Sequence, residues 1–225
     1  MRGERRAAAP GPGRWESLRR VLPRLAEELE LRATGRWMLY GLLLGVVGGL
    51  GAMLFENGLE LAQTRILPGL AGFFPPRAGD ASAVFPGGAD SSPLWWLVVL
   101  LPALGGLASG VLVFTLAPEA EGHGTDAMIR SFHRFHGQVR ARVVPLKALA
   151  SCITIGTGGS AGKEGPIAQI GSGFGSLLAT WLRLSRRDRR LMLLAGASAG
   201  LGAIFQAPLG AALFAGEVLY RESGM

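Results

Sequence analysis

The chain has 225 residues, of which 49% are hydrophobic and 35 are glycine, and its formal net charge is +7. A single cysteine, Cys152, excludes an internal disulfide framework, and no cysteine–histidine cluster has the spacing of a metal site. We therefore expect neither a metal nor a cofactor. The long uncharged stretches predict an all-α membrane protein.

The N-terminal region, 1–36, differs from the rest of the chain in composition and in its density of charged residues. Residues 1–13 are rich in proline and glycine and have no apolar core, so we expect disorder there and no signal peptide. Residues 14–34 carry apolar side chains at roughly helical spacing among many charges, which predicts an amphipathic cytoplasmic helix. Residues 37–225 then form the transmembrane domain.

Within this domain, three uncharged stretches are long enough to span a bilayer: 37–55, 93–118 and 191–216. Two further apolar segments, 143–162 and 167–182, are interrupted by Lys147 and by a glycine-rich run, and they predict broken or re-entrant helices. Glycines four residues apart favour close helix contacts in lipid. These are Gly41, Gly45 and Gly49, then Gly171 and Gly175, then Gly196 and Gly200.

The distribution of arginine predicts the topology. Arginines concentrate before residue 37, in 119–142 and in 183–190, whereas 56–93 has few of them and several acidic residues. The positive-inside rule puts the three basic regions in the cytoplasm and 56–93 outside. The positive charge is thus explained by orientation, with no nucleic acid partner. We expect a multi-pass protein with a cytoplasmic N-terminus, in a bacterial-type plasma membrane.

The glycine-rich run at 156–166 is the most informative feature, because it puts a nearly side-chain-free backbone beside Lys163 and Glu164 in an apolar region. Pro166 favours the first turn of a helix. A helix that begins inside the membrane directs free N–H groups and a partial positive charge at whatever lies ahead, which suits an anion. Glu164 lies at the same place and could compete for that position, or could pair with Lys163.

The sequence Gly162-Lys163-Glu164-Gly165-Pro166 resembles the signature of the CLC family of chloride channels and chloride/proton antiporters, and 200–217 resembles its next conserved region. The resemblance implies an antiparallel inverted-repeat fold, a homodimer in membrane lipid and one pathway per subunit for chloride or other small anions. This chain resembles the first repeat alone. An inactive truncated fragment therefore remains an alternative.

The resemblance also implies roles for individual residues. It implies that Glu164 is the gating glutamate. The anion pathway includes these residues: Gly162, Lys163, Gly165, Pro166 and Ile167, together with His123, Gly124 and Thr125. His123 stands where the family usually has a serine. It could add a titratable charge near the anion. Alternatively it is a solvated loop residue before a helix that Thr125 and Asp126 cap.

The resemblance also identifies a coupling position, at which exchangers of the family commonly have a proton-accepting glutamate. In this chain Val218 occupies that position, and Glu217 lies one residue earlier. Valine cannot carry a proton, which favours a gated chloride channel over a chloride/proton antiporter. We expect no enzymatic activity. A P-loop nucleotide site is a remote alternative, because Glu164 stands where that motif has Ser or Thr and would repel phosphate.

Overall fold

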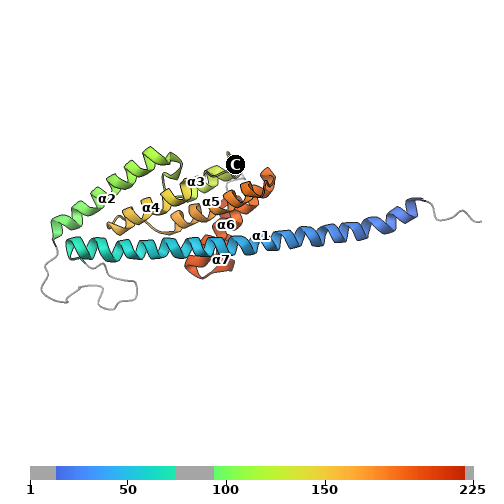
Figure 1. Cartoon of the computed structure of the whole chain (residues 1–225), viewed down its shortest axis with the longest axis horizontal. Coiled ribbons are helices and arrows are strands. Elements are labelled where there is room, and N and C mark those ends of the chain that lie inside the picture. The colour runs from blue at the N-terminus through green and yellow to red at the C-terminus, as the bar shows by residue number, and fades with distance from the viewer. Residues whose placement is uncertain (1–13, 74–93, 221–225) are drawn as a thin grey trace, which may run out of the picture. The chain divides into compact units, whose positions relative to one another are not determined.

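A computed structural model describes residues 14–73 and 94–220, with side chains for 34–73 and 94–217. These residues form helices and their connections, without a strand among them, as the sequence predicts (Figure 1). The expected disorder of 1–13 lies outside the described residues. Contacts divide the chain into two units, Met1–Leu42 and Leu43–Met225.

In the first unit, the described residues are the N-terminal part of a single long helix, α1 (Arg14–Ile66). The helix runs without interruption past residue 36, the boundary between the two domains that we predict. Within this unit the rings of Trp37 and Tyr40 meet edge to face, with 5.8 Å between their centroids. The predicted helix at 14–34 is confirmed as a helix, and its side-chain arrangement lies outside the described residues.

In the second unit, α1 continues to Ile66 and ends in a π-helical turn, Leu67–Ala71. The first span, expected at 37–55, is therefore too short, because the helix continues through residue 66. Residues 56–66 contain no proline and are rich in good helix formers, so nothing stops the helix there. Pro68 and Gly72, which has a left-handed φ of 63°, end the turn.

The expected second span is confirmed as α2 (Trp95–Leu116). By length and hydropathy, α2 and the segment Thr34–Ala71 are the two candidate membrane spans among the described residues. A 3₁₀ turn (Pro118–Ala120) follows α2 and leads to the short helix α3 (Thr125–His133).

The predicted break in the next apolar region is also present. Helix α4 (Val143–Gly156) ends at the first residue of the glycine-rich run, residues 157–163 are not helical, and α5 (Glu164–Trp181) begins within the motif. The helix starts two residues before Pro166, which then lies in its first turn, where a missing N–H costs nothing.

The prediction of one span at 191–216 is wrong, because this segment is divided between α6 (Arg186–Phe205) and α7 (Pro208–Tyr220). Gln206 between them has a left-handed φ of 52°. Pro208 disfavours helical backbone at the residue before it and cannot donate to the preceding turn, so the helix breaks and restarts.

The core of the second unit is the contact between α5 and α6, which pack along each other (Figure 1). Glycines bring the backbones together: a methyl group built on Gly171 would lie 3.1 Å from the carbonyl carbon of Gly196, and one on Gly175 would lie 2.7 Å from that of Met192. The close contact predicted for these glycines is confirmed. Gly45 and Gly49 on α1 have no neighbour within 4 Å of such a group among the described residues.

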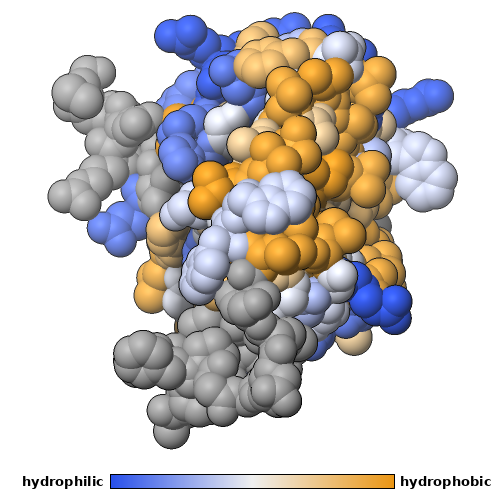
Figure 2. Space-filling view, turned by 90° about the vertical axis from the view of Figure 1, so that its left-hand side faces the viewer, coloured by the Kyte–Doolittle hydropathy of each residue, from blue (hydrophilic) through white to orange (hydrophobic). Residues whose placement is uncertain are grey.

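Helix α1 instead approaches the core through Gly48, which faces Ala199 on α6, and Gly51, which faces the ring of Phe174 on α5. Many large apolar side chains on α1 and α2 remain exposed, among them Leu50, Leu54, Val99 and Phe114. Figure 2 shows apolar residues gathered in one broad area of the face that it presents, with hydrophilic residues at its margins. Such exposure suits contact with lipid or with further apolar protein.

The topology prediction can be checked by cysteine labelling in a Cys152→Ser background. We expect Leu70→Cys to react with a membrane-impermeant maleimide added outside, and Arg186→Cys to react only after permeabilisation. Both positions are exposed in the structure, so lack of access would reflect the membrane and not burial. The reverse pattern would invert the assignment of 183–190 to the cytoplasm.

Candidate functional site

The candidate site lies where the first residues of α3 and α5 meet. A methyl group built on Gly165 would lie 2.8 Å from the carbonyl carbon of His123, and one on Gly124 would lie 2.7 Å from the carbonyl carbon of Gly165. Gly124 also has a φ of 102°, which residues other than glycine rarely adopt. The two segments that the sequence singled out, about forty residues apart, therefore touch through their backbones.

The beginnings of both helices provide free backbone donors. The first N–H groups of a helix have no partner within it. In α5, Pro166 has no N–H and the N–H of Ile167 donates to the carbonyl of Lys163 at 3.1 Å, so Glu164 and Gly165 carry the remaining donors of the first turn. In α3, the N-cap is Gly124 and makes no side-chain cap hydrogen bond. Thr125 and Asp126 therefore follow the cap residue and do not cap the helix as expected.

The loop that precedes α5 uses its own N–H groups internally. The N–H of Gly159 donates to the carbonyl of Thr154 at 2.8 Å, and that of Ala161 donates to the carbonyl of Gly159 at 2.9 Å. In a phosphate-binding loop the N–H groups converge on one external point. The N–H groups of Gly159 and Ala161 do not, because they are used within the loop. The donors that could meet an anion are those at the helix starts.

Glu164 lies at the first position of α5 with its carboxylate folded back over Gly162. A methyl group built on Gly162 would lie 3.1 Å from Cδ of Glu164, so a side chain there would require this carboxylate to move. The side chain is exposed, and it makes no ion pair or side-chain hydrogen bond within the described part of the chain. The alternative in which Glu164 pairs with Lys163 is therefore wrong.

Lys163 pairs instead with Glu56 on α1, with its Nζ donating to Oε1 of the glutamate. Both side chains are roughly one-third to two-fifths exposed. Lys163 and Glu56 are 107 residues apart in sequence, and the pair ties the loop before α5 to α1. Its effect is to turn the cation of the motif away from the neighbouring carboxylate.

A cavity of about 320 Å³ adjoins Glu164. Its walls come from α2, α4, the segment 120–123 and the start of α5, and it has room for several waters or a hydrated small anion. Hydroxyl groups line the α2 and α4 walls, where Thr154 Oγ1 donates to Ser109 Oγ at 2.9 Å. The start of α5, hydroxyl groups and the carboxylates of Glu164 and Glu121 thus share one space.

Lys147 on α4 is the buried cation of this cavity. Its side chain is 6% exposed, and its Nζ donates to the carbonyls of Ala120 at 3.0 Å and Gly122 at 2.6 Å. A buried charge is tolerated only when such partners replace water. These two bonds fasten the segment before α3 to α4 and place a positive charge near the junction.

A cluster of ion pairs around Glu119 also holds the connection between α2 and α3 in place. Glu119 pairs with Arg140 and, at 3.2 Å, with Arg142, and its backbone carbonyl accepts from Gln169 Nε2 at 3.1 Å. Partial burial raises the pKa of Glu119. Its backbone hydrogen bond and the two arginines outweigh this effect and hold the pKa below its ordinary value.

The structure brings together some of the residues predicted for the anion pathway and leaves others aside. The following line the cavity: Gly162, Glu164, Gly165, Pro166 and His123. Lys163, Gly124, Thr125 and Ile167 do not line it, and the side chain of Ile167 is fully buried in the core. His123 is exposed, and its carbonyl contacts Gly165. The side chain of Val218 lies outside the described residues, and Glu217 is exposed on α7.

Sequence reasoning missed two residues of the site. Lys147 was treated as an interruption of an apolar segment, although a lone lysine among apolar residues is itself a signal of function. Glu56 directly follows the uncharged stretch 37–55, and nothing around it in the sequence predicts a role. Only the fold brings it to Lys163, so no local pattern could have found that pair.

Comparison with known proteins places these features in context. The family model for voltage-gated chloride channels matches residues 105–225. A chloride/fluoride channel protein of Pseudomonas syringae is 36% identical over 155 residues, which is 67% of this chain and 34% of the relative. An H(+)/Cl(-) exchange transporter ClcA of Yersinia pseudotuberculosis is 33% identical over 182 residues, or 80% of this chain and 35% of the relative.

Solved structures agree on the fold. A CLC-type fluoride/proton antiporter superposes with a TM-score of 0.60 at 24% identity, covering 84% of this chain and 40% of the antiporter. A slow cyanobacterial Cl⁻/H⁺ antiporter gives a TM-score of 0.55 at 24% identity, covering 81% and 39%. The chain thus spans about a third of the length of the curated relatives and two-fifths of these structures.

Proposed function

Because the chain belongs to the CLC family of voltage-gated chloride channels, we propose that it forms the first repeat of a membrane anion pathway with Glu164 as its gate. The observation that carries this proposal is the free carboxylate of Glu164 at the start of α5, beside a cavity that His123, just before α3, also lines. When ionised, this carboxylate competes with an anion for the same helix N-terminus. When protonated or displaced, it leaves the position to the anion.

The proposed substrate is chloride or another small anion, held by backbone donors and not by a paired cation. Support comes from Lys163, whose ammonium is engaged by Glu56, and from Lys147, whose ammonium is engaged by two carbonyls. Neither cation is free to trap an anion in a tight ion pair. Such a site binds weakly enough for the anion to leave again.

Between the two modes of transport in the family, we propose the channel. Its support is the sequence of α7, where Glu217 is followed by a valine. Successive residues of a helix differ by about 100° in direction, so Glu217 faces a neighbourhood different from that of position 218. The relatives do not decide this point, because their names include both a channel and an exchanger.

The experiment that tests the function measures chloride and proton movement together in liposomes that contain the protein. We expect chloride to follow its own gradient, with no steady proton uptake in proportion to it, because valine offers no site for a proton. Uptake in fixed ratio to chloride, abolished by Glu217→Gln, would assign the protein to the antiporters. Absence of any anion flux would favour the inactive fragment.

The contact between Glu56 and Lys163 leads to a second prediction. Glu56→Gln leaves the ammonium of Lys163 without its partner and one residue away from Glu164, so we expect it to attract that carboxylate. Protonation of Glu164 would then need a more acidic solution, and the activating pH should fall. The measurement is anion flux as a function of external pH.

The charge-swapped double variant Glu56→Lys/Lys163→Glu and the single variant Glu56→Asp serve as controls. If the ion pair is what matters, Glu56→Asp should keep most of the original pH profile. The double variant should have a profile closer to the original than Glu56→Lys alone or Lys163→Glu alone. A profile that Glu56→Gln leaves unchanged would show that the pair does not influence the gate.

A further inference from the structure

The structure contains a groove between α1 and α5 that the proposed anion pathway does not use. It has a volume of about 660 Å³, and apolar side chains from both helices form most of its wall: Val47 on α1, with Phe174, Leu177 and Leu178 on α5. It is open on one side and lies next to a close contact between the two helices. That contact lies at Gly51, which faces Phe174.

One end of this groove is polar. Thr180, Trp181 and Arg183 line it at the turn where α5 ends. The side chain of Trp181 is 86% exposed, which is unusual for the largest apolar ring unless something covers it. Tryptophan with one apolar and one polar side is typical of the boundary between hydrocarbon and headgroups.

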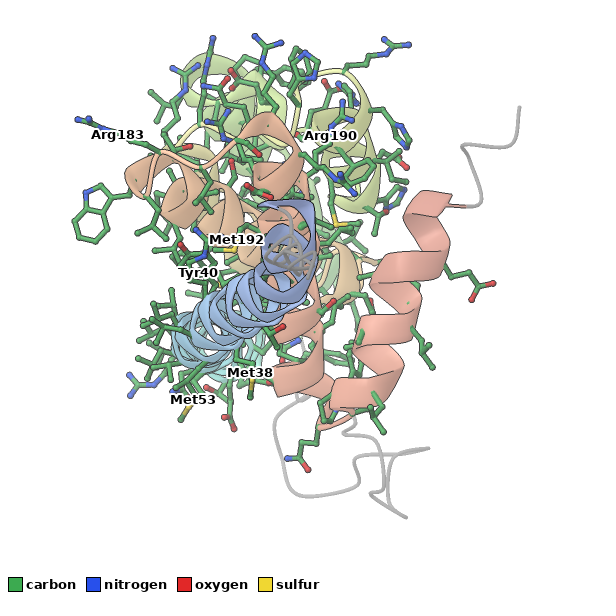
Figure 3. All side chains as sticks on the ribbon, turned by 90° about the vertical axis from the view of Figure 1, so that its right-hand side faces the viewer. Met38, Tyr40, Met53, Arg183, Arg190 and Met192 are labelled. Atoms are coloured by element: carbon green, nitrogen blue, oxygen red, sulfur yellow. The ribbon has the colours of Figure 1, made fainter. Side chains whose placement is uncertain are left out.

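Arg183 is held at this boundary by the backbone. Its φ is 52°, and its N–H donates to the carbonyl of Thr180 at 3.1 Å, so the turn that follows α5 fixes its position. Figure 3 shows Arg183 and Arg190 on the same side of the molecule, among many side chains that end in nitrogen. The surrounding charge is therefore strongly positive.

The arginines of 183–190 differ in their contacts. Arg190 is committed within the protein, because its guanidinium donates to the carbonyl of His133, approaches His136 Nδ1 and lies 5.5 Å from the ring centroid of Phe132. By contrast, Arg183, Arg186 and Arg187 are exposed and form no ion pair within the described residues. The one acidic residue of the segment, Asp188, is engaged with Ser185.

We propose that this groove binds an anionic phospholipid, with one acyl chain against Val47 and Leu177 and the phosphate at Arg183. A guanidinium matches a phosphate by paired hydrogen bonds, and an apolar groove with a tryptophan at its mouth matches an acyl chain below its headgroup. Charge complementarity selects this occupant. A zwitterionic lipid would leave the excess of arginine uncompensated.

Fluorescence of Trp181 tests the proposal in the full chain reconstituted in vesicles. Phosphatidylglycerol or phosphatidylcholine with brominated acyl chains is added, and the contribution of Trp181 is obtained by subtracting the signal of Trp181→Phe. We expect phosphatidylglycerol to quench Trp181 at about five-fold lower concentration than phosphatidylcholine, the preference that one arginine near an anionic headgroup provides.

Two variants make the test specific. Arg183→Gln should abolish the preference, whereas Arg134→Gln, an exposed arginine outside the groove, should preserve it. Leu178→Phe, which narrows the groove without adding another tryptophan, should reduce quenching by both lipids. Circular dichroism confirms that each variant is folded. Equal quenching by the two lipids would reduce the groove to ordinary lipid contact, and absence of quenching would show that protein covers it. Either result would overturn the proposal.

Discussion

Replacing Glu164 by glutamine is expected to remove nearly all of the pH dependence of anion flux while the flux itself persists. The structure supports this because the carboxylate has no ion-pair partner among the described residues and lies over Gly162 at the edge of the cavity. Glutamine has the same shape but cannot ionise, so it mimics the protonated, released state at every pH. Flux should be measured in liposomes over a range of external pH.

The matched control is Glu121→Gln, which removes a second exposed carboxylate that lines the same cavity. If any loss of negative charge near the anion path were sufficient, both variants would flatten the profile equally. We expect the effect in Glu164→Gln alone. A pH profile that survives this substitution would exclude Glu164 as the gate.

Adding a single methyl group at the contact between α5 and α6 is expected to destabilise the protein more than any comparable change on α1. In Gly175→Ala, the new group would lie 2.7 Å from the carbonyl carbon of Met192 and 3.2 Å from Cα of Leu193, and backbone cannot move aside as a side chain can. Overpacking of this kind costs about 1–3 kcal/mol. In a domain of this size each kcal/mol lowers the Tm by roughly 2–4 °C.

Gly49→Ala is the control, since nothing lies within 4 Å of the added group among the described residues. Alanine is the better helix former by about 1 kcal/mol, so this variant should be neutral or slightly stabilising. Thermal unfolding of both variants in detergent, followed by circular dichroism, gives the comparison. Equal changes in Tm would mean that the contact between α5 and α6 is looser than the structure shows.

The sequence predicts those structural features that are caused by residues close together in the chain. The helix that begins at Glu164 follows from a proline and glycines next to each other, and the span at α2 follows from its apolar length. The break at Gln206 escaped prediction because apolar residues continue across it. A hydropathy pattern records burial or lipid contact and does not record the backbone effect of Pro208.

The candidate site shows the same division. The motif around Glu164 was visible because its residues are consecutive. The partners of the two lysines were not visible, since Glu56 reaches Lys163 and the carbonyl of Ala120 reaches Lys147 across long stretches of chain. Long-range pairs are fixed by how helices cross, which short-range periodicity does not contain. The glycine spacing on α1 likewise gave the correct kind of contact but the wrong residues.

The two lysines have a practical consequence. They are the only lysines in the sequence, and they differ in exposure: Lys147 is almost fully buried, and Lys163 is partly accessible. Amine-reactive reagents therefore have two distinguishable side-chain targets in the whole chain. The ratio of their modification is a built-in chemical footprint of correct assembly, because Lys147 becomes reactive only when the segment before α3 separates from α4. Batches of purified protein could be graded by this ratio before any flux is measured.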